Sequence, residues 1–223
     1  MGELITFKRP DGDTCPAYLA SSASASAPAL VLIQEWWGLN QQMKGLADRM
    51  AAQGFRTLVP DLYRGKLATD ADEANHMMDA LNFMDAAQQD IQGAVNFLKE
   101  LSKEVAVAGF CMGGALTLIS AVKVSGLAAG VCFYGIPPAE AADLSQIKLP
   151  LSLHFGTQDE WCSPAAVRDL EVRLKAGGVD YELFSYQADH AFMNEQRPEV
   201  YSAENASLAF ERATAFLKRN LRS

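Results

Sequence analysis

A chain of 223 residues with 49% apolar residues is long enough to bury one substantial core, and we expect a single soluble domain over residues 1–223. The net charge of −8 argues against nucleic-acid or anionic-membrane binding, which needs excess lysine and arginine. Three histidines without HxH or HExxH, and cysteines without CxxC, predict no metal site. The N-terminus lacks signal-peptide regions, so we expect a cytoplasmic protein with reduced thiols.

Short apolar segments alternate with helical patterns in the first half of the chain. The segments 4–9 and 16–20 are predicted to form a hairpin, and the Ser/Ala-rich segment 21–29 a loop. The pattern continues with a strand at 29–34, a helix at 39–54, a strand at 55–60, a helix within 64–80 and a helix at 84–101.

The second half repeats this alternation. Strands are predicted at 104–109, 128–135, 149–156 and 180–186, and helices after residue 111, from 164 to about 176, and at 203–221. The strands are continuously apolar rather than alternating, which favours a mostly parallel sheet with helices on both faces.

Polar side chains directly follow several of these strands. In open parallel sheets the reactive site forms beyond the carboxyl ends of the strands, so these residues are expected to share one edge. They are Glu35, Asp61, Tyr63, Arg64, Cys111, Asp159 and His190.

Cys111 lies in the sequence Gly-Phe-Cys-Met-Gly, where an apolar strand gives way to a helix. A sharp strand-to-helix turn needs small neighbours, and it exposes the side chain at its apex. The helix N-terminus favours a thiolate, and the N–H of Met112 is expected to point toward a developing oxyanion. The alternative is a buried structural cysteine, the usual role of this residue type and the one we expect for Cys15, Cys132 and Cys162.

A nucleophilic thiol needs a base, and the base needs an orienting acid. The order Cys111, Asp159, His190 is that of nucleophile, acid and base in α/β-hydrolases. The competing residues are expected to have other roles: His154 in the core, His76 on a solvated helix face, and Asp61 disfavoured by its position before the cysteine.

Glu35 follows a buried strand, where a carboxylate is costly unless it is hydrogen-bonded or paired. It is either a surface acid at the rim or a second carboxylate close to Cys111 that holds or accepts the thiol proton. Trp36 beside it is a candidate for the second oxyanion N–H.

The motifs "QEWWG", "PDLYRG", "GFCMGGAL", "HFGTQDEWCSP" and "DHAF" together resemble the dienelactone hydrolase (carboxymethylenebutenolidase) family over nearly the whole chain. The resemblance implies an α/β-hydrolase fold without a large cap domain and a triad of Cys111, His190 and Asp159. It also implies oxyanion donors from the backbone of Trp36 and Met112. In that family the glutamate that corresponds to Glu35 holds the resting thiol neutral until substrate binds.

The chain departs from this family at the arginines that hold a substrate carboxylate. Asn194 stands where one arginine is expected, four residues after His190, and no arginine or lysine lies between Lys66 and Lys99. Arg64 or Arg197 could substitute, although neither is at the matching position. Dienelactone as the substrate therefore does not follow. The candidate substrate-binding residues are Tyr63, Arg64, Tyr134 and Phe192.

The leading hypothesis is a cofactor-free hydrolase of small carboxylic esters or lactones that works through an acyl-enzyme on Cys111. A thioesterase and a non-catalytic binding or sensor protein on the same fold are the alternatives. A redox role of Cys111 is weakened because the spacing offers no resolving cysteine. The sequence leaves the oligomeric state open.

Overall fold

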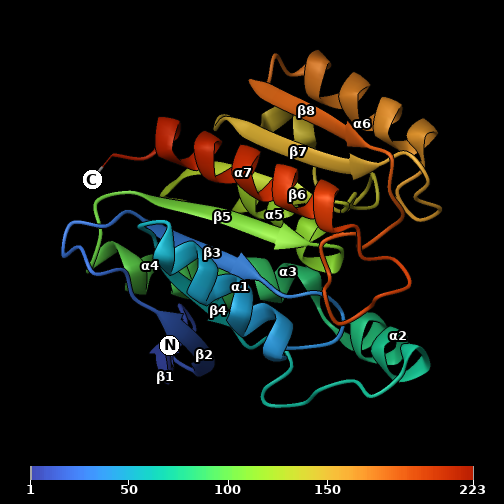
Figure 1. Ribbon diagram of the computed structural model, residues 1–223. Helices are drawn as coiled ribbons and strands as arrows, with labels where there is room; N and C mark the ends of the chain where they lie inside the picture. Colours follow the sequence, from blue (N-terminus) through green and yellow to red (C-terminus); the bar gives the residue numbers. More distant parts are fainter. Residues whose placement is uncertain (1, 223) are drawn as a thin grey trace.

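One sheet of eight strands organises residues 2–222, which the computed structural model describes (Figure 1). Its strand order is β1-β2-β4-β3-β5-β6-β7-β8, with β2 antiparallel to both of its neighbours and all other pairs parallel. The strands are β1 (Glu3–Lys8), β2 (Thr14–Ala20), β3 (Ala29–Ile33), β4 (Arg56–Pro60), β5 (Val105–Phe110), β6 (Leu127–Phe133), β7 (Leu151–Gly156) and β8 (Tyr181–Tyr186).

Helices cover both faces of this sheet, as the apolar strand pattern predicted. α1 and α7 lie over one face, and α4 and α5 pack against the other (Figure 1). The helices are α1 (Gln41–Ala52), α2 (Ala71–Ala80), α3 (Phe83–Asp85), the π-helix η1 (Ala86–Ile91), α4 (Gln92–Lys99), α5 (Met112–Lys123), the 3₁₀-helix η2 (Leu144–Gln146), α6 (Pro164–Ala176) and α7 (Ala203–Asn220).

Local chemistry explains where these elements begin and how they pack. Every residue of β3 and β5 is buried, because these central strands lie between two helical layers. Asn40 begins α1 by accepting a hydrogen bond from the N–H of Met43 at 3.1 Å. Ser163 begins α6 in the same way, with Pro164 in the first helical turn.

The helix predicted at 84–101 is interrupted, which is the main departure from the expected elements. α3 passes into the π-helix η1 before α4 begins. Within η1, the buried carboxylate of Asp90 pairs with Arg9 at 3.2 Å and Arg64 at 2.7 Å, and so ties the β1–β2 hairpin and the turn after β4 to this segment. Periodicity alone does not reveal such a change in helix type.

This sheet positions the candidate site, because most of the candidate functional residues lie just beyond the carboxyl ends of its strands. α2 lies at that same edge of the sheet (Figure 1). None of the helices in residues 2–222 combines the length and apolar character required to span a bilayer.

Candidate active site

Cys111 occupies a strained turn between β5 and α5. Its φ of 54° and ψ of −116° lie where a side chain is rarely tolerated. The turn is tight because glycines flank it: a Cβ on Gly109 would lie 2.1 Å from the carbonyl oxygen of Gly113. A Cβ on Gly113 would in turn lie 2.5 Å from the carbonyl oxygen of Ile33. The two glycines therefore allow the close approach that carries the thiol to the start of α5.

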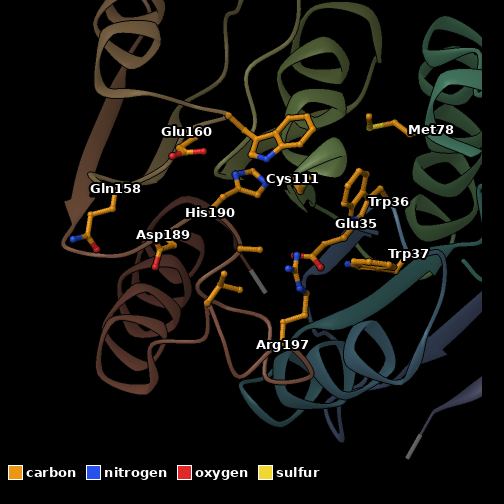
Figure 2. Close-up of a pocket in the computed structure, with 13 residues that line it drawn as sticks. Glu35, Trp36, Trp37, Met78, Cys111, Gln158, Glu160, Asp189, His190 and Arg197 are labelled. Atoms are coloured by element: carbon orange, nitrogen blue, oxygen red, sulfur yellow. The ribbon is translucent and has the colours of Figure 1, made fainter. Parts of the chain in front are cut away.

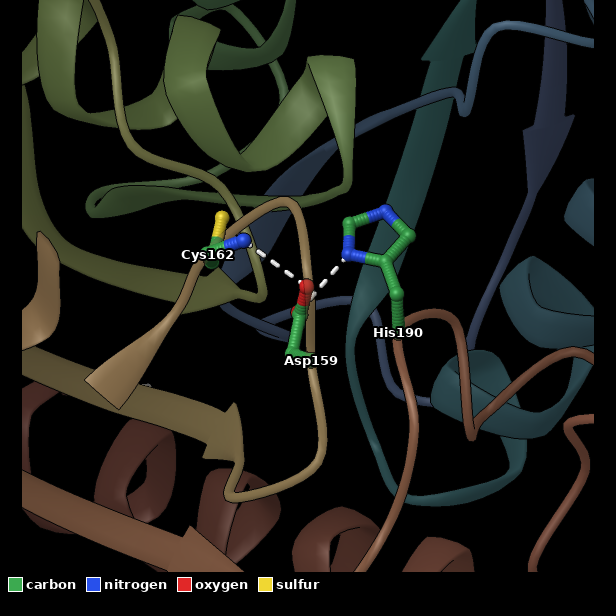
Figure 3. A group of neighbouring side chains, drawn as sticks. All are labelled: Asp159, Cys162 and His190. Carbon is green, nitrogen blue, oxygen red and sulfur yellow. Dashed lines mark hydrogen bonds and ion pairs between the residues drawn. The ribbon is translucent and has the colours of Figure 1, made fainter. Parts of the chain in front are cut away.

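Asp159 and His190 lie in the loops after β7 and β8 and form a short hydrogen bond (Figure 3). The Nδ1 atom of His190 is 2.7 Å from Oδ2 of Asp159. The other oxygen, Oδ1, accepts hydrogen bonds from the backbone N–H groups of Trp161 and Cys162, with N···O distances of 2.7 Å in both. Asp159 is only 2% exposed, so these bonds hold a buried carboxylate in one orientation.

The protonation of His190 follows from its neighbours. Burial lowers the pKa of the imidazole, but hydrogen bonding to Asp159 and to Cys111 outweighs this and raises it to about 10. Because Nδ1 is occupied by Asp159, Nε2 is left for the thiol. The three side chains can therefore act as a nucleophile, a base and an orienting acid.

One group of metal-ligand type exists among residues 2–222: Asp159, Cys162 and His190 offer ligand atoms within 4.8 Å of one another (Figure 3). Each atom already has another partner, since Asp159 binds His190 and the Cys162 thiol donates to the carbonyl of Tyr134 at 3.3 Å. None of the four cysteines forms a disulfide in the structure.

Glu35 follows β3 and is 4% exposed, so it is not a surface acid. The hydroxyl of Tyr134 donates to Oε1 at 3.1 Å, and Nδ2 of Asn194 donates to Oε2 at 2.6 Å. Burial raises the pKa of Glu35, while these two hydrogen bonds and the charge of His190 lower it. The carboxyl group thus lies beside His190 and is held by two neutral donors.

Two backbone donors remain available at the site. Among residues 2–222, the N–H groups of Trp36 and Met112 donate to no other group. Met112 is the first residue of α5, where N–H groups have no partner within the helix. Both are therefore free to bind an oxyanion that forms next to Cys111.

Two cavities of different character meet at Cys111 and His190. The smaller, of about 250 Å³, is polar on one side, and Glu35, Trp37 and Arg197 lie close together there (Figure 2). The larger, of about 490 Å³, is mostly apolar. The apolar side chains that line the larger cavity include those of Met78, Leu81, Phe83, Met112, Ala115, Ile136, Pro138, Ala141 and Trp161.

The four candidate substrate-binding residues have different positions. Tyr134 lines the larger cavity, and Phe192 is fully buried behind it with its ring edge-on at 5.5 Å. Tyr63 is buried and donates its hydroxyl to Sδ of Met112 at 3.3 Å. Arg64 pairs with Asp90 at 2.7 Å and is not among the residues that line either cavity.

The structure places the residues that compete with the proposed triad, His154, His76 and Asp61, in other roles, as the sequence predicted. His154 is fully buried in β7 and bonds to Ser152 and Tyr186. His76 is exposed on α2. Asp61 accepts the N–H groups of its own turn, which gives it a structural role.

Three residues at the site were missed or only partly anticipated. Arg197 was considered only as a substitute arginine, yet it lines the smaller cavity, stacks over Trp37 at 5.7 Å and pairs with Glu199. Trp161 is 66% exposed and packs edge-on against Trp36 at 5.8 Å, forming a wall of the cavities. Asn194 was noted only as a missing arginine. No local sequence pattern around Asn194 predicts its hydrogen bond to Glu35.

The sheet order, the strained cysteine turn and the His–Asp pair after the last two strands define an α/β-hydrolase without a cap. Residues 15–221 match the Dienelactone hydrolase family, and the chain belongs to this family of hydrolases. It is 34% identical to protein usf of Aquifex pyrophilus over 99% of this chain and 100% of that one. It is 28% identical to carboxymethylenebutenolidase of Pseudomonas putida over 96% of this chain and 95% of that one.

Solved structures agree on the fold. A dienelactone hydrolase-like promiscuous phosphotriesterase from metagenomic libraries superposes with a TM-score of 0.85 at 22% identity, over 99% of both chains. At this level of identity the likeness bears on the fold alone.

Proposed function

We propose that this protein is a cysteine-dependent hydrolase of small carboxylic esters or lactones, with Cys111 as nucleophile, His190 as base and Asp159 as the acid that orients it. The observation that carries the proposal is the 2.7 Å bond between His190 and Asp159 beside a strained cysteine at a helix N-terminus. This arrangement fits an activated nucleophile. The carboxymethylenebutenolidase relatives support ester or lactone substrates.

The chemistry proceeds in two steps through an acyl-enzyme. The thiolate of Cys111 attacks the carbonyl carbon, and the carbonyl electron pair moves to the oxygen, which accepts the N–H groups of Trp36 and Met112. When this intermediate collapses, the carbon–oxygen bond to the alcohol breaks, and the alcohol takes a proton from His190. Water then gives a proton to His190 and attacks the thioester carbon. The carbon–sulfur bond breaks, which releases the carboxylic acid product and restores the Cys111 thiolate beside protonated His190.

The shape of the site limits the substrate. The apolar walls of the larger cavity suit an alkyl or aryl arm on one side of the scissile carbonyl. The smaller cavity, with Glu35 and Arg197, suits a compact polar arm. An ester or lactone that carries one apolar and one polar arm fits both cavities at once.

The test is hydrolysis of p-nitrophenyl acetate and butyrate, a thioester and a carboxylated lactone by Cys111→Ala and His190→Ala. Each variant is expected to lose activity by on the order of 1,000-fold or more while keeping its fold. Cys15→Ala and His76→Ala are matched controls, since Cys15 is buried in β2 and His76 is exposed, and both should retain activity.

Activity within tenfold of the wild type in either active-site variant would contradict the assignment. A wild-type protein that turns over no member of the panel, but whose melting temperature rises with ligands, would favour the binding or sensor alternative. Faster turnover of the thioester than of the oxygen esters would favour a thioesterase.

A further inference from the structure

The two cavities at the site share one short wall, which Met78, Cys111, Trp161 and His190 line from both sides. A substrate whose carbonyl lies at Cys111 therefore extends one arm into each cavity. One is the acyl arm, which stays on Cys111 in the acyl-enzyme, and the other is the alcohol arm, which leaves. The cavities differ in volume, at about 490 and 250 Å³, so the two arms are not interchangeable.

The smaller cavity is the side from which water reaches His190. Gln158, Glu160 and Asp189 lie on the His190 side of this cavity (Figure 2). All three side chains are exposed, so this part of the cavity is continuous with solvent.

The larger cavity has an apolar interior that begins at the thiol. Its inner wall includes the buried side chains of Met112 and Ala115, from the first turns of α5. Its outer wall includes the half-buried side chains of Leu81 and Phe83, from the segment between α2 and η1, and of Ile136, from the loop after β6. Such walls favour a hydrocarbon group that removes them from water.

The charged groups of the larger cavity lie at its mouth. The carboxylates of Asp79 and Glu140 line it, and both residues are exposed. Within the described part of the chain, His190 is the one other residue of this lining that can carry a charge near neutral pH. A charged arm would therefore lose its hydration in the interior without gaining an ion pair, whereas an uncharged arm carries no such penalty.

Ala115 lies where this cavity begins. It follows Cys111 by one helical turn, and its N–H donates to the carbonyl of Cys111 at 3.1 Å. Residues four apart share one face of a helix, so the methyl group of Ala115 faces the same space as the thiol. Gly135 borders this wall, and a Cβ there would lie 2.3 Å from the nitrogen of Ala115. Two very small residues thus leave the hollow open directly beside Cys111.

Hydrolysis of the acyl-enzyme decides which arm belongs in which cavity. After the alcohol has left, the attacking water takes its place beside His190, while the acyl arm is still attached to Cys111. The place of the alcohol must therefore be open to solvent, as the smaller cavity is. An acyl arm in the larger cavity leaves that route free, whereas the reverse arrangement would block it.

We propose that the larger cavity binds the acyl arm of the substrate as an uncharged hydrocarbon chain, and that Ala115 determines how long a chain is accepted. The smaller cavity then takes the alcohol arm and, after it, the attacking water. This deepens the proposed function, on which it rests, and narrows the substrates to esters of apolar acids longer than acetic acid. Each buried methylene is expected to raise kcat/KM about threefold, until the chain reaches the exposed mouth.

The test is kcat/KM for p-nitrophenyl acetate, butyrate and hexanoate, which share one leaving group and differ only in the acyl arm. In the wild type, butyrate should exceed acetate by about tenfold. Ala115→Leu fills the start of the larger cavity, and should lower the ratio of hexanoate to acetate by about tenfold or more. Because the esters react at the same carbonyl, a general loss of activity cancels from this ratio.

A second variant and a matched control complete the design. Ile136→Phe narrows the larger cavity from its half-buried outer wall and should also lower the ratio, which keeps the test decisive where Ala115→Leu folds poorly. Val200→Phe adds bulk to the smaller cavity at a position that is also half-buried. It should leave the acyl ratio unchanged, and should slow butyl butyrate relative to methyl butyrate, both followed in a pH-stat.

Equal kcat/KM for acetate and hexanoate in the wild type would overturn the proposal, as would an unchanged ratio in both Ala115→Leu and Ile136→Phe. A gain with length in the alcohol series but not in the acyl series would also overturn it, because the arms would then be reversed. Turnover of acetate that Cys111→Ala abolishes, together with a flat acyl series, would leave the hydrolase assignment standing. Failure of this inference is therefore distinguishable from failure of the proposed function.

Discussion

At the scale of single residues, the site depends on how Asp159 is held. Two backbone N–H groups bind one of its oxygens and His190 binds the other, so the imidazole has one tautomer and one orientation. In the proposed mechanism Asp159 therefore has two separable roles, one structural and one in directing the proton of His190.

The variant Asp159→Asn separates these roles. The amide oxygen can still accept the N–H groups of Trp161 and Cys162, while its NH₂ group faces Nδ1 of His190 and favours the wrong tautomer. We expect kcat/KM for an aryl ester to fall by on the order of 10³–10⁴-fold with little change in melting temperature. Activity within tenfold of the wild type would mean that Asp159 only shapes its loop.

Residues differ in how far the sequence alone reveals their role. The turn around Cys111 was predictable because its requirements are local: small neighbours, a strand before it and a helix after it. Glu35 was predicted to be near Cys111, but its partners were not, because the bond to Asn194 joins residues 159 positions apart. The ion pair between Arg64 and Asp90 was not predicted, because the position of Arg64 after β4 does not show which acid binds it.

At the scale of elements, β7 carries a buried histidine with a structural role. The ring of His154 stacks between Phe133 at 4.6 Å and Phe184 at 5.3 Å. Its nitrogens bond to Ser152 at 3.1 Å and Tyr186 at 2.8 Å. Burial lowers the pKa of His154 from 6.5 to about 3, so the ring stays neutral in the folded protein.

This burial predicts a specific acid sensitivity. Below pH 6.5 the unfolded chain binds a proton at His154, whereas the folded protein does not bind it until about pH 3. The free energy of unfolding therefore falls as the pH drops from 6.5 to 3. By pH 4.5 the loss amounts to about 3 kcal/mol. Urea unfolding at pH 7 and 4.5 should show a smaller acid loss in His154→Gln, which cannot titrate. An equal loss in variant and wild type would contradict this account.

Elements were predictable where the pattern was strong and uniform. The buried strands and amphipathic helices follow from apolar periodicity, and Ser163-Pro164 marked the start of α6. The π-helix η1 was not predictable from local sequence, because it accompanies a contact between distant parts of the chain. Within η1, Asp90 forms ion pairs with arginines from the first hairpin and from the turn after β4.

At the scale of the whole molecule, the sheet gathers residues that are distant in sequence. β3, β5, β7 and β8 each end next to one member of the site, and their neighbouring positions in the parallel part of the sheet bring those members together (Figure 1). The fold could be predicted because continuous apolar strands permit few architectures. The two cavities could not, because their walls come from loops and helix ends whose packing the sequence does not specify.

Some expectations concern properties beyond the fold and remain predictions. These are the single domain over residues 1–223 and the cytoplasmic location. The substrate is a proposal as well, and it rests on two cavities that meet at Cys111, of which the smaller carries the charged side chains of Glu35 and Arg197.

The most direct test of the central claim is to trap the acyl-enzyme. The protein is mixed with p-nitrophenyl acetate, quenched in acid during the first turnovers, digested and analysed by mass spectrometry. We expect a burst of about one p-nitrophenol per chain and an acetyl group on the peptide that contains Cys111, as a covalent intermediate requires. Sustained turnover with the acetyl group on another residue, or with none on Cys111 at any quench time, would contradict the proposed mechanism.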